Sequence, residues 1–243
     1  MLGPAQRERG VDGRSLHLVF DILAWATALA TMAFVRRLWF PAHPVARPMR
    51  LGYIAAVLFG AGAGAWLLGT ANLWLSGIHQ AGRSVEGALI GAIAAIEIYK
   101  KVHGVAARTG AAYALPLALG IAVGRIGCLL SGLDDNTHGI ATGADWGWDF
   151  DDGILRHPVQ LYESLAMAGF ALVYVIEMAR GSAFWRANGF YLAVLFYGAQ
   201  RFIWEFLKPY EAAIAGLTLF QIISLLLITY AAERIWTNRQ ATA

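Results

Sequence analysis

Three charged residues interrupt long apolar stretches of this chain. Arg125 lies within GAAYALPLALGIAVGRIGCLLSG, and Arg201 and Glu205 lie within a later stretch. An ionisable side chain at membrane depth costs at least ~2.5 kcal/mol, so it usually faces a partner or an aqueous cavity. Arg201 and Glu205 are four residues apart and can pair on one helical face. Arg125 has no such acid nearby in the sequence, so it needs a partner from elsewhere or a ligand.

Other polar residues are predicted to lie at a similar depth. They are Glu86 and, from RHPVQLYESL, His157, Gln160, Tyr162 and Glu163. We expect these groups and the two arginines to converge on one cavity. Guanidinium groups bind phosphate bidentately and stay charged, so the cavity suits an anionic ligand such as a phospholipid headgroup. The alternative is a set of internal salt bridges that only hold the helices together.

The elements that must position these residues are predicted to be membrane-spanning helices. Of 243 residues, 58% are hydrophobic and only 14% are charged, with a mean hydropathy of +0.53. About 20 apolar residues cross ~30 Å of hydrocarbon as a helix. Continuous Ala-, Leu- and Gly-rich runs favour helices over barrel strands, which alternate in polarity. Seven such stretches are present, at about 16–35, 51–75, 85–99, 111–132, 159–179, 189–206 and 212–233.

The predicted fold is therefore an all-α integral membrane protein of about seven transmembrane helices around a polar cavity on the outward side. No linker or repeat divides the chain, so we expect one domain over residues 1–243. The first fifteen residues are polar and carry three arginines, which does not indicate a signal peptide.

The orientation follows from the positive charges between the stretches. Eleven Lys and Arg residues lie after stretches one, three, five and seven, against six in the N-terminus and the other connections. Because cytoplasmic segments are enriched in Lys and Arg, the C-terminus is predicted to be cytoplasmic and the N-terminus outside. The acidic loop at about 133–156 then faces outward.

Two function classes are disfavoured by composition. The net charge of +3 is too small to suggest nucleic-acid binding. Cys128 is the sole cysteine, and it has no companion at metal-ligand spacing in the sequence, so we expect no disulfide and no metal. Cys128 is interpreted as a small packing residue, with a reactive or substrate-contacting thiol as the alternative.

Three segments together resemble the signatures of bacterial prolipoprotein diacylglyceryl transferase. They are GRIGCLLSG at 124–132, HPVQLYES at 157–164 and RFIWEFLKP at 201–209, in matching order and spacing. SVEGALIG at 84–91, GIATGADWG at 139–147 and GLTLFQIIS at 216–224 resemble further family segments. The match covers about residues 84–224.

The resemblance implies a seven-helix inner-membrane enzyme. Such an enzyme moves diacylglyceryl from phosphatidylglycerol to the cysteine of a lipoprotein signal peptide, releasing glycerol phosphate, with no cofactor. Arg125 and Arg201 match arginines that engage the lipid phosphate, and Glu205 matches the acid beside the second. Substrate binding is assigned to residues of the first two signatures, namely Gly124, Gly127, His157, Gln160, Tyr162 and Glu163.

The chemistry of this reaction calls for the same groups. Negative charge grows on the departing phosphate, so cationic donors placed beforehand stabilise the transition state. The attacking thiol must lose its proton, since the thiolate is the nucleophile. Glu86 and Glu163 are the candidate bases, and we place Glu86 with Arg125, Arg201 and Glu205 in the catalytic set.

Three departures from the family pattern change the chemistry and leave the acceptor open. Glu86 stands where the pattern has histidine, Cys128 stands where it has asparagine, and only Phe20 or Asp21 lies near the place of a tyrosine in the first stretch. Glutamate can accept a proton, but it can instead neutralise an arginine. The alternatives are a phospholipid-modifying enzyme with another acceptor, or a membrane protein that binds lipid without catalysis.

Overall fold

A computed structural model describes residues 13–242, and residues 1–12 of the polar N-terminal stretch lie outside the described part. Seven long helices dominate it: α1 (Gly13–Leu38), α2 (Arg50–Leu75), α3 (Val85–Val102), α4 (Ala114–Leu130), α5 (Val159–Ala179), α6 (Ala183–Glu205) and α7 (Leu219–Thr242). Short 3-10 segments are η2 (Arg47–Met49), η3 (Ala111–Tyr113) and η4 (Gly132–Asp135), and two strands, β1 (Trp148–Asp149) and β2 (Leu155–Arg156), pair antiparallel.

The protein is an all-α membrane protein by the length and composition of its helices. Five segments are long and apolar enough to cross a bilayer: Ser15–Leu38, Arg47–Leu75, Ala111–Leu130, Val159–Ala179 and Leu219–Asn238. Large apolar side chains cover the outside of these helices, including Leu51 and Phe59 on α2, which are 79% and 76% exposed. Helices α3 and α6 fall outside this group. They carry ionisable residues that the interior of the bundle buries, namely Glu86, Arg201 and Glu205.

Two predicted boundaries are corrected by local backbone chemistry. Helix α6 begins at 183 rather than 189, because the Ser182 side chain caps it by accepting a hydrogen bond from the Trp185 amide. The last helix begins at 219 rather than 212. The chain before it turns back on itself, with Ala215 and Gly216 in the left-handed region and Ile214 paired to Leu217.

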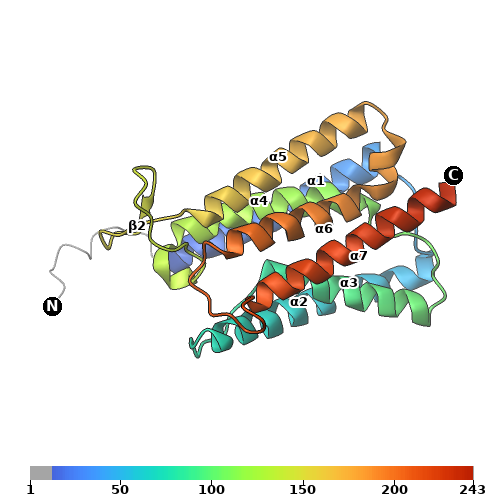
Figure 1. The fold of residues 1–243 in the computed structure, drawn as a ribbon. Coiled ribbons are helices and arrows are strands. Elements are labelled where there is room, and N and C mark those ends of the chain that lie inside the picture. Colours follow the sequence, from blue (N-terminus) through green and yellow to red (C-terminus); the bar gives the residue numbers. More distant parts are fainter. Residues whose placement is uncertain (1–12, 243) are drawn as a thin grey trace.

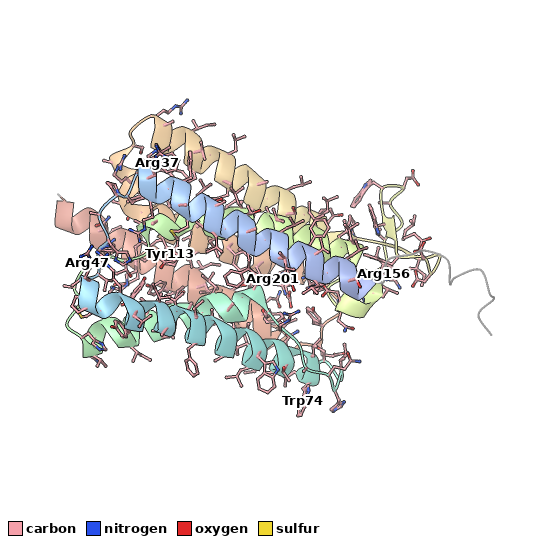
Figure 2. The ribbon with its side chains drawn as sticks, turned by 180° about the vertical axis from the view of Figure 1, so that it is seen from behind. Arg37, Arg47, Trp74, Tyr113, Arg156 and Arg201 are labelled. Atoms are coloured by element: carbon pink, nitrogen blue, oxygen red, sulfur yellow. The ribbon has the colours of Figure 1, made fainter. Side chains whose placement is uncertain are left out.

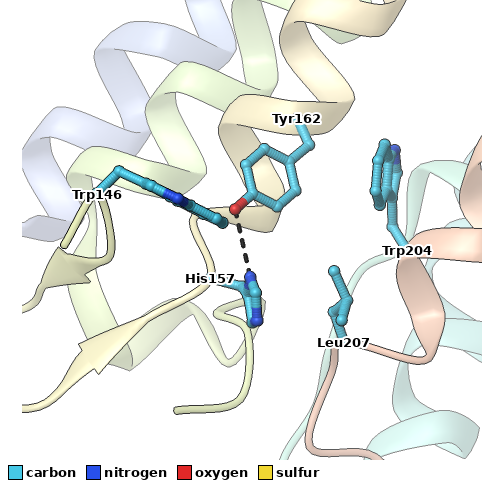
Figure 3. Close-up of a pocket in the computed structure, with 5 residues that line it drawn as sticks. All are labelled: Trp146, His157, Tyr162, Trp204 and Leu207. Atoms are coloured by element: carbon cyan, nitrogen blue, oxygen red, sulfur yellow. Dashed lines mark hydrogen bonds between the residues drawn. The ribbon is translucent and has the colours of Figure 1, made fainter. Parts of the chain in front are cut away.

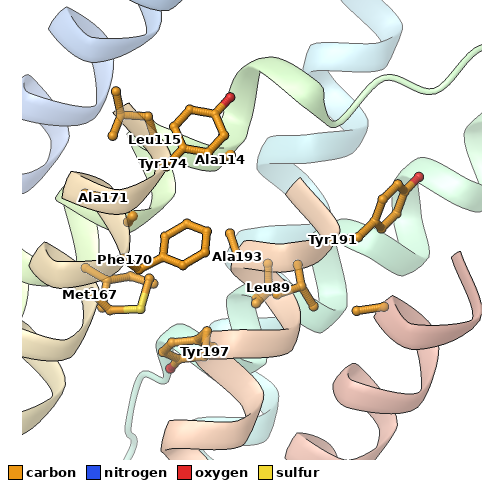
Figure 4. Close-up of a cluster of buried hydrophobic side chains, with 14 of the residues drawn as sticks. Leu89, Ala114, Leu115, Met167, Phe170, Ala171, Tyr174, Tyr191, Ala193 and Tyr197 are labelled. Atoms are coloured by element: carbon orange, nitrogen blue, oxygen red, sulfur yellow. The ribbon is translucent and has the colours of Figure 1, made fainter. Parts of the chain in front are cut away.

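The helices pack as two groups joined by α7 (Figure 1). Helices α1, α4, α5 and α6 lie side by side, α7 packs along α6, and the α2–α3 hairpin lies beyond α7. The core between them is apolar and aromatic, and Figure 4 shows Phe170, Tyr174, Tyr191 and Tyr197 among its side chains. This packing sets α3, α4, α5, α6 and α7 around one common interior.

The α2–α3 hairpin depends on glycine. A Cβ added at Gly64 would meet the carbonyl oxygen of Gly87, and one added at Gly60 would meet that of Gly91. Small residues four apart allow this approach of two backbones, as the stretches 60–66 and 87–92 predict. The hairpin holds the first turn of α3, and with it Glu86, against the rest of the bundle.

The segment between α4 and α5 is pinned to the connection between α6 and α7. The Ile140 amide donates to the Leu207 carbonyl at 2.7 Å, and the Tyr210 hydroxyl donates to the Asn136 carbonyl at 2.7 Å. The predicted acidic loop is therefore packed against the end of the bundle where α4 and α6 end and α5 and α7 begin.

Replacing Gly64 with leucine should destabilise the hairpin, since the new side chain has no room between the two backbones. We expect Gly64→Leu to cost about 1–3 kcal/mol of unfolding free energy, measured in detergent. Gly62→Leu is the matched control, because nothing lies within 4 Å of a Cβ at Gly62. Equal stability of the two variants would contradict the packing described.

Candidate active site

One carboxylate joins the two arginines. Glu163, near the start of α5, pairs through Oε2 with Nε of Arg125 from α4, and its Oε1 lies 2.8 Å from Nη1 of Arg201 from α6. Glu163 is fully buried, and the arginines are 7% and 2% exposed. The two guanidinium groups therefore converge, and the acid that Arg125 lacks in the sequence comes from another helix.

Arg201 is surrounded by acids. Its Nη2 lies 2.8 Å from Oε2 of Glu205, the expected pair one turn along α6, and its Nε lies 3.6 Å from Oε2 of Glu86 on α3. The ring of Phe220 on α7 covers its guanidinium at 4.9 Å. Figure 2 places Arg201 inside the bundle, between the end that carries Arg37 and Arg47 and the end that carries Arg156 and Trp74. All three of its nitrogens thus face carboxylates.

Arg125 is less completely engaged. Its Nε binds Glu163, and Nη1 lies 3.8 Å from the sulfur of Cys128 one turn along α4. Glu163 is thus the acid paired with Arg125 among the described residues, whereas Arg201 faces three acids.

A hydroxyl group within α7 and another just before it hold the other two acids. The Ser224 hydroxyl donates to Oε1 of Glu86 at 2.5 Å, and the Thr218 hydroxyl donates to Oε1 of Glu205 at 3.0 Å. Gln221 in turn accepts from the Thr218 amide at 2.9 Å. These residues lie in the 216–224 segment. This segment resembles one of the family, but the sequence alone gives its residues no role in the site.

Lys208 is a site residue that the sequence interpretation missed. It follows α6 in the chain, and its side chain is fully buried, with Nζ 3.0 Å from Oε1 of Glu163. Burial lowers the pKa of Lys208 to about 8, and Arg201 acts in the same direction, while Glu163 opposes them. Because Lys208 lies outside the apolar stretch, the sequence predicts an ordinary charged residue in a loop.

The buried cluster is balanced in formal charge. We call it the charged cluster: Arg125, Arg201, Lys208, Glu86, Glu163 and Glu205. Three cations face three carboxylates, so the sum is zero. Buried charges need partners of opposite sign, and each charge of the cluster has one within 3.6 Å.

The other polar residues of HPVQLYE lie at two places outside the charged cluster. Gln160 is buried, and its Nε2 donates to the Thr137 hydroxyl at 3.3 Å. His157 and Tyr162 line an aromatic pocket of about 440 Å³ with Trp146, Trp204 and Leu207 (Figure 3). The Tyr162 hydroxyl lies 3.3 Å from Nδ1 of His157. The pocket and the charged cluster share α5, where Glu163 follows Tyr162.

Two of the three glycines of the first signature, Gly124 and Gly127, face α1. A Cβ at Gly127 would meet Cβ of Phe20, and one at Gly124 would lie 3.7 Å from Cβ of Ala24. This placement gives both residues a close-packing role between α1 and α4. Their contact with substrate stays a prediction.

The fold brings two ligand-type side chains from other elements to Cys128, which has no companion at metal-ligand spacing in the sequence. His17 of α1 and Asp135 of η4 meet it, with Nε2 of His17 4.0 Å from the sulfur and 3.1 Å from Oδ1 of Asp135. Burial raises the pKa of Asp135, but hydrogen bonds from His17 and Thr137 outweigh it and bring the pKa below its usual value. His17 lies more than 100 positions from Cys128 and Asp135, so sequence spacing could not reveal the group.

These features define a polytopic helical membrane protein whose buried ionisable residues gather near one end of the bundle. The sequence model of prolipoprotein diacylglyceryl transferase matches residues 13–237. The chain therefore belongs to the prolipoprotein diacylglyceryl transferase family.

Curated relatives carry the name phosphatidylglycerol–prolipoprotein diacylglyceryl transferase. The protein from Idiomarina loihiensis is 35% identical over 154 residues, covering 60% of this chain and 55% of its own. The protein from Aeromonas hydrophila is 32% identical over 178 residues, covering 68% and 61%. The chain thus spans little more than half the length of these relatives. No solved structure matches it significantly.

Removing the shared carboxylate should destabilise the protein, because Arg125 and Lys208 lose their acid and Arg201 loses one of its three. We expect Glu163→Ala to cost about 3–5 kcal/mol of unfolding free energy. The control is Glu177→Ala in the same helix, whose pair with Arg180 is largely exposed and is worth about 0–1 kcal/mol. Equal losses in the two variants, measured by denaturation in detergent, would refute the bridging role.

Proposed function

We propose that this protein transfers the diacylglyceryl group of phosphatidylglycerol to the cysteine sulfur of a lipoprotein signal peptide, releasing glycerol phosphate. The observation that carries the proposal is the convergence of Arg125 and Arg201 on Glu163. Membership of the family and the names of the relatives support the same reaction.

The proposed setting is the bacterial cytoplasmic membrane, with all seven helices spanning it. In this arrangement α3 and α6 cross as interior helices, which is why they tolerate ionisable residues. The distribution of Lys and Arg supports an outside N-terminus and a cytoplasmic C-terminus. The charged cluster then lies toward the outer leaflet, where lipid entry opens a polar cavity around it.

The phosphate of the lipid is proposed to bind Arg125 first. Arg125 is paired with one acid, Glu163, whereas Arg201 is shared among three acids. Arg201 holds Glu163 in position. Its positive charge also stabilises the negative charge that grows on the departing phosphate. Arg125 is thus the main phosphate donor, and Arg201 is the residue that positions the cluster.

Nearby polar atoms can serve the rest of the headgroup. The Tyr197 hydroxyl, Oε1 of Gln160 and Nε2 of Gln221 are buried without a hydrogen-bond partner among the described residues. Tyr197 also interacts electrostatically with both arginines. An unpaired buried polar group is costly, and a phosphoglycerol headgroup supplies the missing donors and acceptors. His157 and Tyr162 are proposed to contact the acceptor, the lipoprotein signal peptide, at the aromatic pocket.

Glu86 is proposed to take the proton of the attacking thiol. The thiolate sulfur then forms the bond to glycerol carbon as the bond from that carbon to the phosphate oxygen breaks, and glycerol phosphate leaves with the electron pair. A phosphate monoanion brings the balanced cluster to −1, which favours protonation of one carboxylate. Both oxygens of Glu163 are held by cations, so Glu86 is the freer acid.

The arginine assignment is tested with purified protein, phosphatidylglycerol and a lipobox peptide. Arg125→Lys keeps the charge but loses the fork of donors, so we expect peptide modification to fall by about 10²–10³-fold. Arg180→Lys is the control, because Arg180 is exposed at the other end of α5. Unchanged activity of folded Arg125→Lys would remove the phosphate assignment.

The same assay separates the alternatives. Glycerol phosphate release without peptide modification would indicate another acceptor. Absence of any turnover with the wild type would indicate a lipid-binding protein.

The proton-acceptor role of Glu86 predicts a specific pattern of rescue. Glu86→Gln keeps the shape and a hydrogen-bond acceptor for Ser224, but it cannot take a proton, so we expect a loss of about 10²–10⁴-fold in transfer rate. Glu86→His restores a base and should recover much of that loss. A fully active Glu86→Gln would assign Glu86 to charge balance alone.

A further inference from the structure

Three different metal-ligating side chains meet outside the charged cluster. The ligand atoms of His17, Cys128 and Asp135 all lie within 4.8 Å of one another, and they come from α1, α4 and η4. Nε2 of His17 is 3.1 Å from Oδ1 of Asp135 and 4.0 Å from the sulfur of Cys128. Ligands of a tetrahedral zinc ion, bound at about 2.0 Å for N or O and about 2.3 Å for S, lie roughly 3.3–3.5 Å apart. Small side-chain movements thus reach ligand geometry.

A second carboxylate orients the histidine. Nδ1 of His17 lies 3.1 Å from Oδ2 of Asp21, one helical turn along α1, and Arg83 contacts the same oxygen at 3.4 Å. Metal-bound histidines usually donate their other ring nitrogen to a carboxylate, which fixes the tautomer that binds the metal. Asp21 therefore orients the ring so that Nε2 faces Cys128 and Asp135, and Nε2 can bind a metal ion once it loses the proton that it shares with Asp135.

We infer that His17, Cys128 and Asp135 form a site for a borderline-soft divalent metal ion, with zinc as the best match to its nitrogen, sulfur and oxygen donors. Binding releases the thiol proton of Cys128 and any proton on Nε2 of His17 to solvent. The thiolate and the carboxylate then balance the two positive charges of the ion. Three protein ligands leave a fourth position for water or an external ligand.

The neighbouring charges permit this site. Arg125 is the cation beside Cys128, with Nη1 3.8 Å from the sulfur, but its charge is already paired with Glu163. Metal binding replaces this long contact and the contact between Nε2 of His17 and Oδ1 of Asp135. The ion would tie the start of α1 to the end of α4 beside the proposed phosphate donor. The inference itself does not depend on the proposed transfer reaction.

The test uses the full chain in detergent, stripped of metal with a chelator and titrated with Co²⁺. We expect one equivalent of Co²⁺ to give a thiolate-to-cobalt charge-transfer band and tetrahedral ligand-field bands, and Zn²⁺ to displace it. Absence of a thiolate band in the wild type would overturn the inference.

Variants identify the ligands. Cys128→Ser should abolish the charge-transfer band, and His17→Gln and Asp135→Asn should each weaken Co²⁺ binding by at least tenfold. Asp21→Asn should weaken it by about 10–100-fold while keeping the band. Asp145→Asn in the outward loop and His103→Gln at the other end of the bundle are matched controls that should bind as the wild type does.

Each variant is compared by its melting temperature without metal. Cys128→Ser is nearly isosteric, so it supplies a folded variant for the decisive comparison. Co²⁺ binding of unchanged affinity in folded Cys128→Ser would mean that other residues hold the ion, and it would overturn the site.

Discussion

The Glu163 carboxylate is the interaction on which the site depends. Two guanidinium groups from different helices repel each other, and in a buried setting that repulsion would separate them. An acid that binds one arginine through each oxygen turns the repulsion into two attractions. Helices α4, α5 and α6 are thereby held in one relative position, and Lys208 and the acids of α3 and α6 complete the balance of charge.

Under the proposed function, this balance explains how a site for an anionic lipid can include Glu86. A glutamate adds a negative charge beside the proposed lipid phosphate, which would weaken binding if the charge stood alone. In this chain Glu86 faces Arg201 and accepts the Ser224 hydroxyl, so its charge belongs to a neutral cluster. Glu86 can thus serve as a proton acceptor in the proposed reaction, while the zero net charge of the cluster avoids repelling the anionic lipid before it binds.

The sequence predicted the helical fold, and it predicted Arg125, Arg201, Glu205, Glu163 and Glu86 as one group, because an ionisable residue in an apolar run must find a partner. It could not identify which acid serves which arginine, since Glu163 and Arg201 are far apart in the chain and meet only through helix packing. Lys208 was missed because it lies just past an apolar stretch, and His17 because contacts between α1 and α4 leave no local pattern. The starts of α6 and α7 were misplaced because a serine cap and a left-handed turn, rather than hydrophobicity, decide them.

The most direct test is an experimental structure of the full chain with phosphatidylglycerol bound in a lipid nanodisc. The account predicts lipid phosphate oxygens within hydrogen-bonding distance of the Arg125 guanidinium, with Arg201 still paired to Glu163 and the glycerol carbons facing Glu86. A headgroup bound away from both arginines, with the charged cluster unchanged, would contradict it.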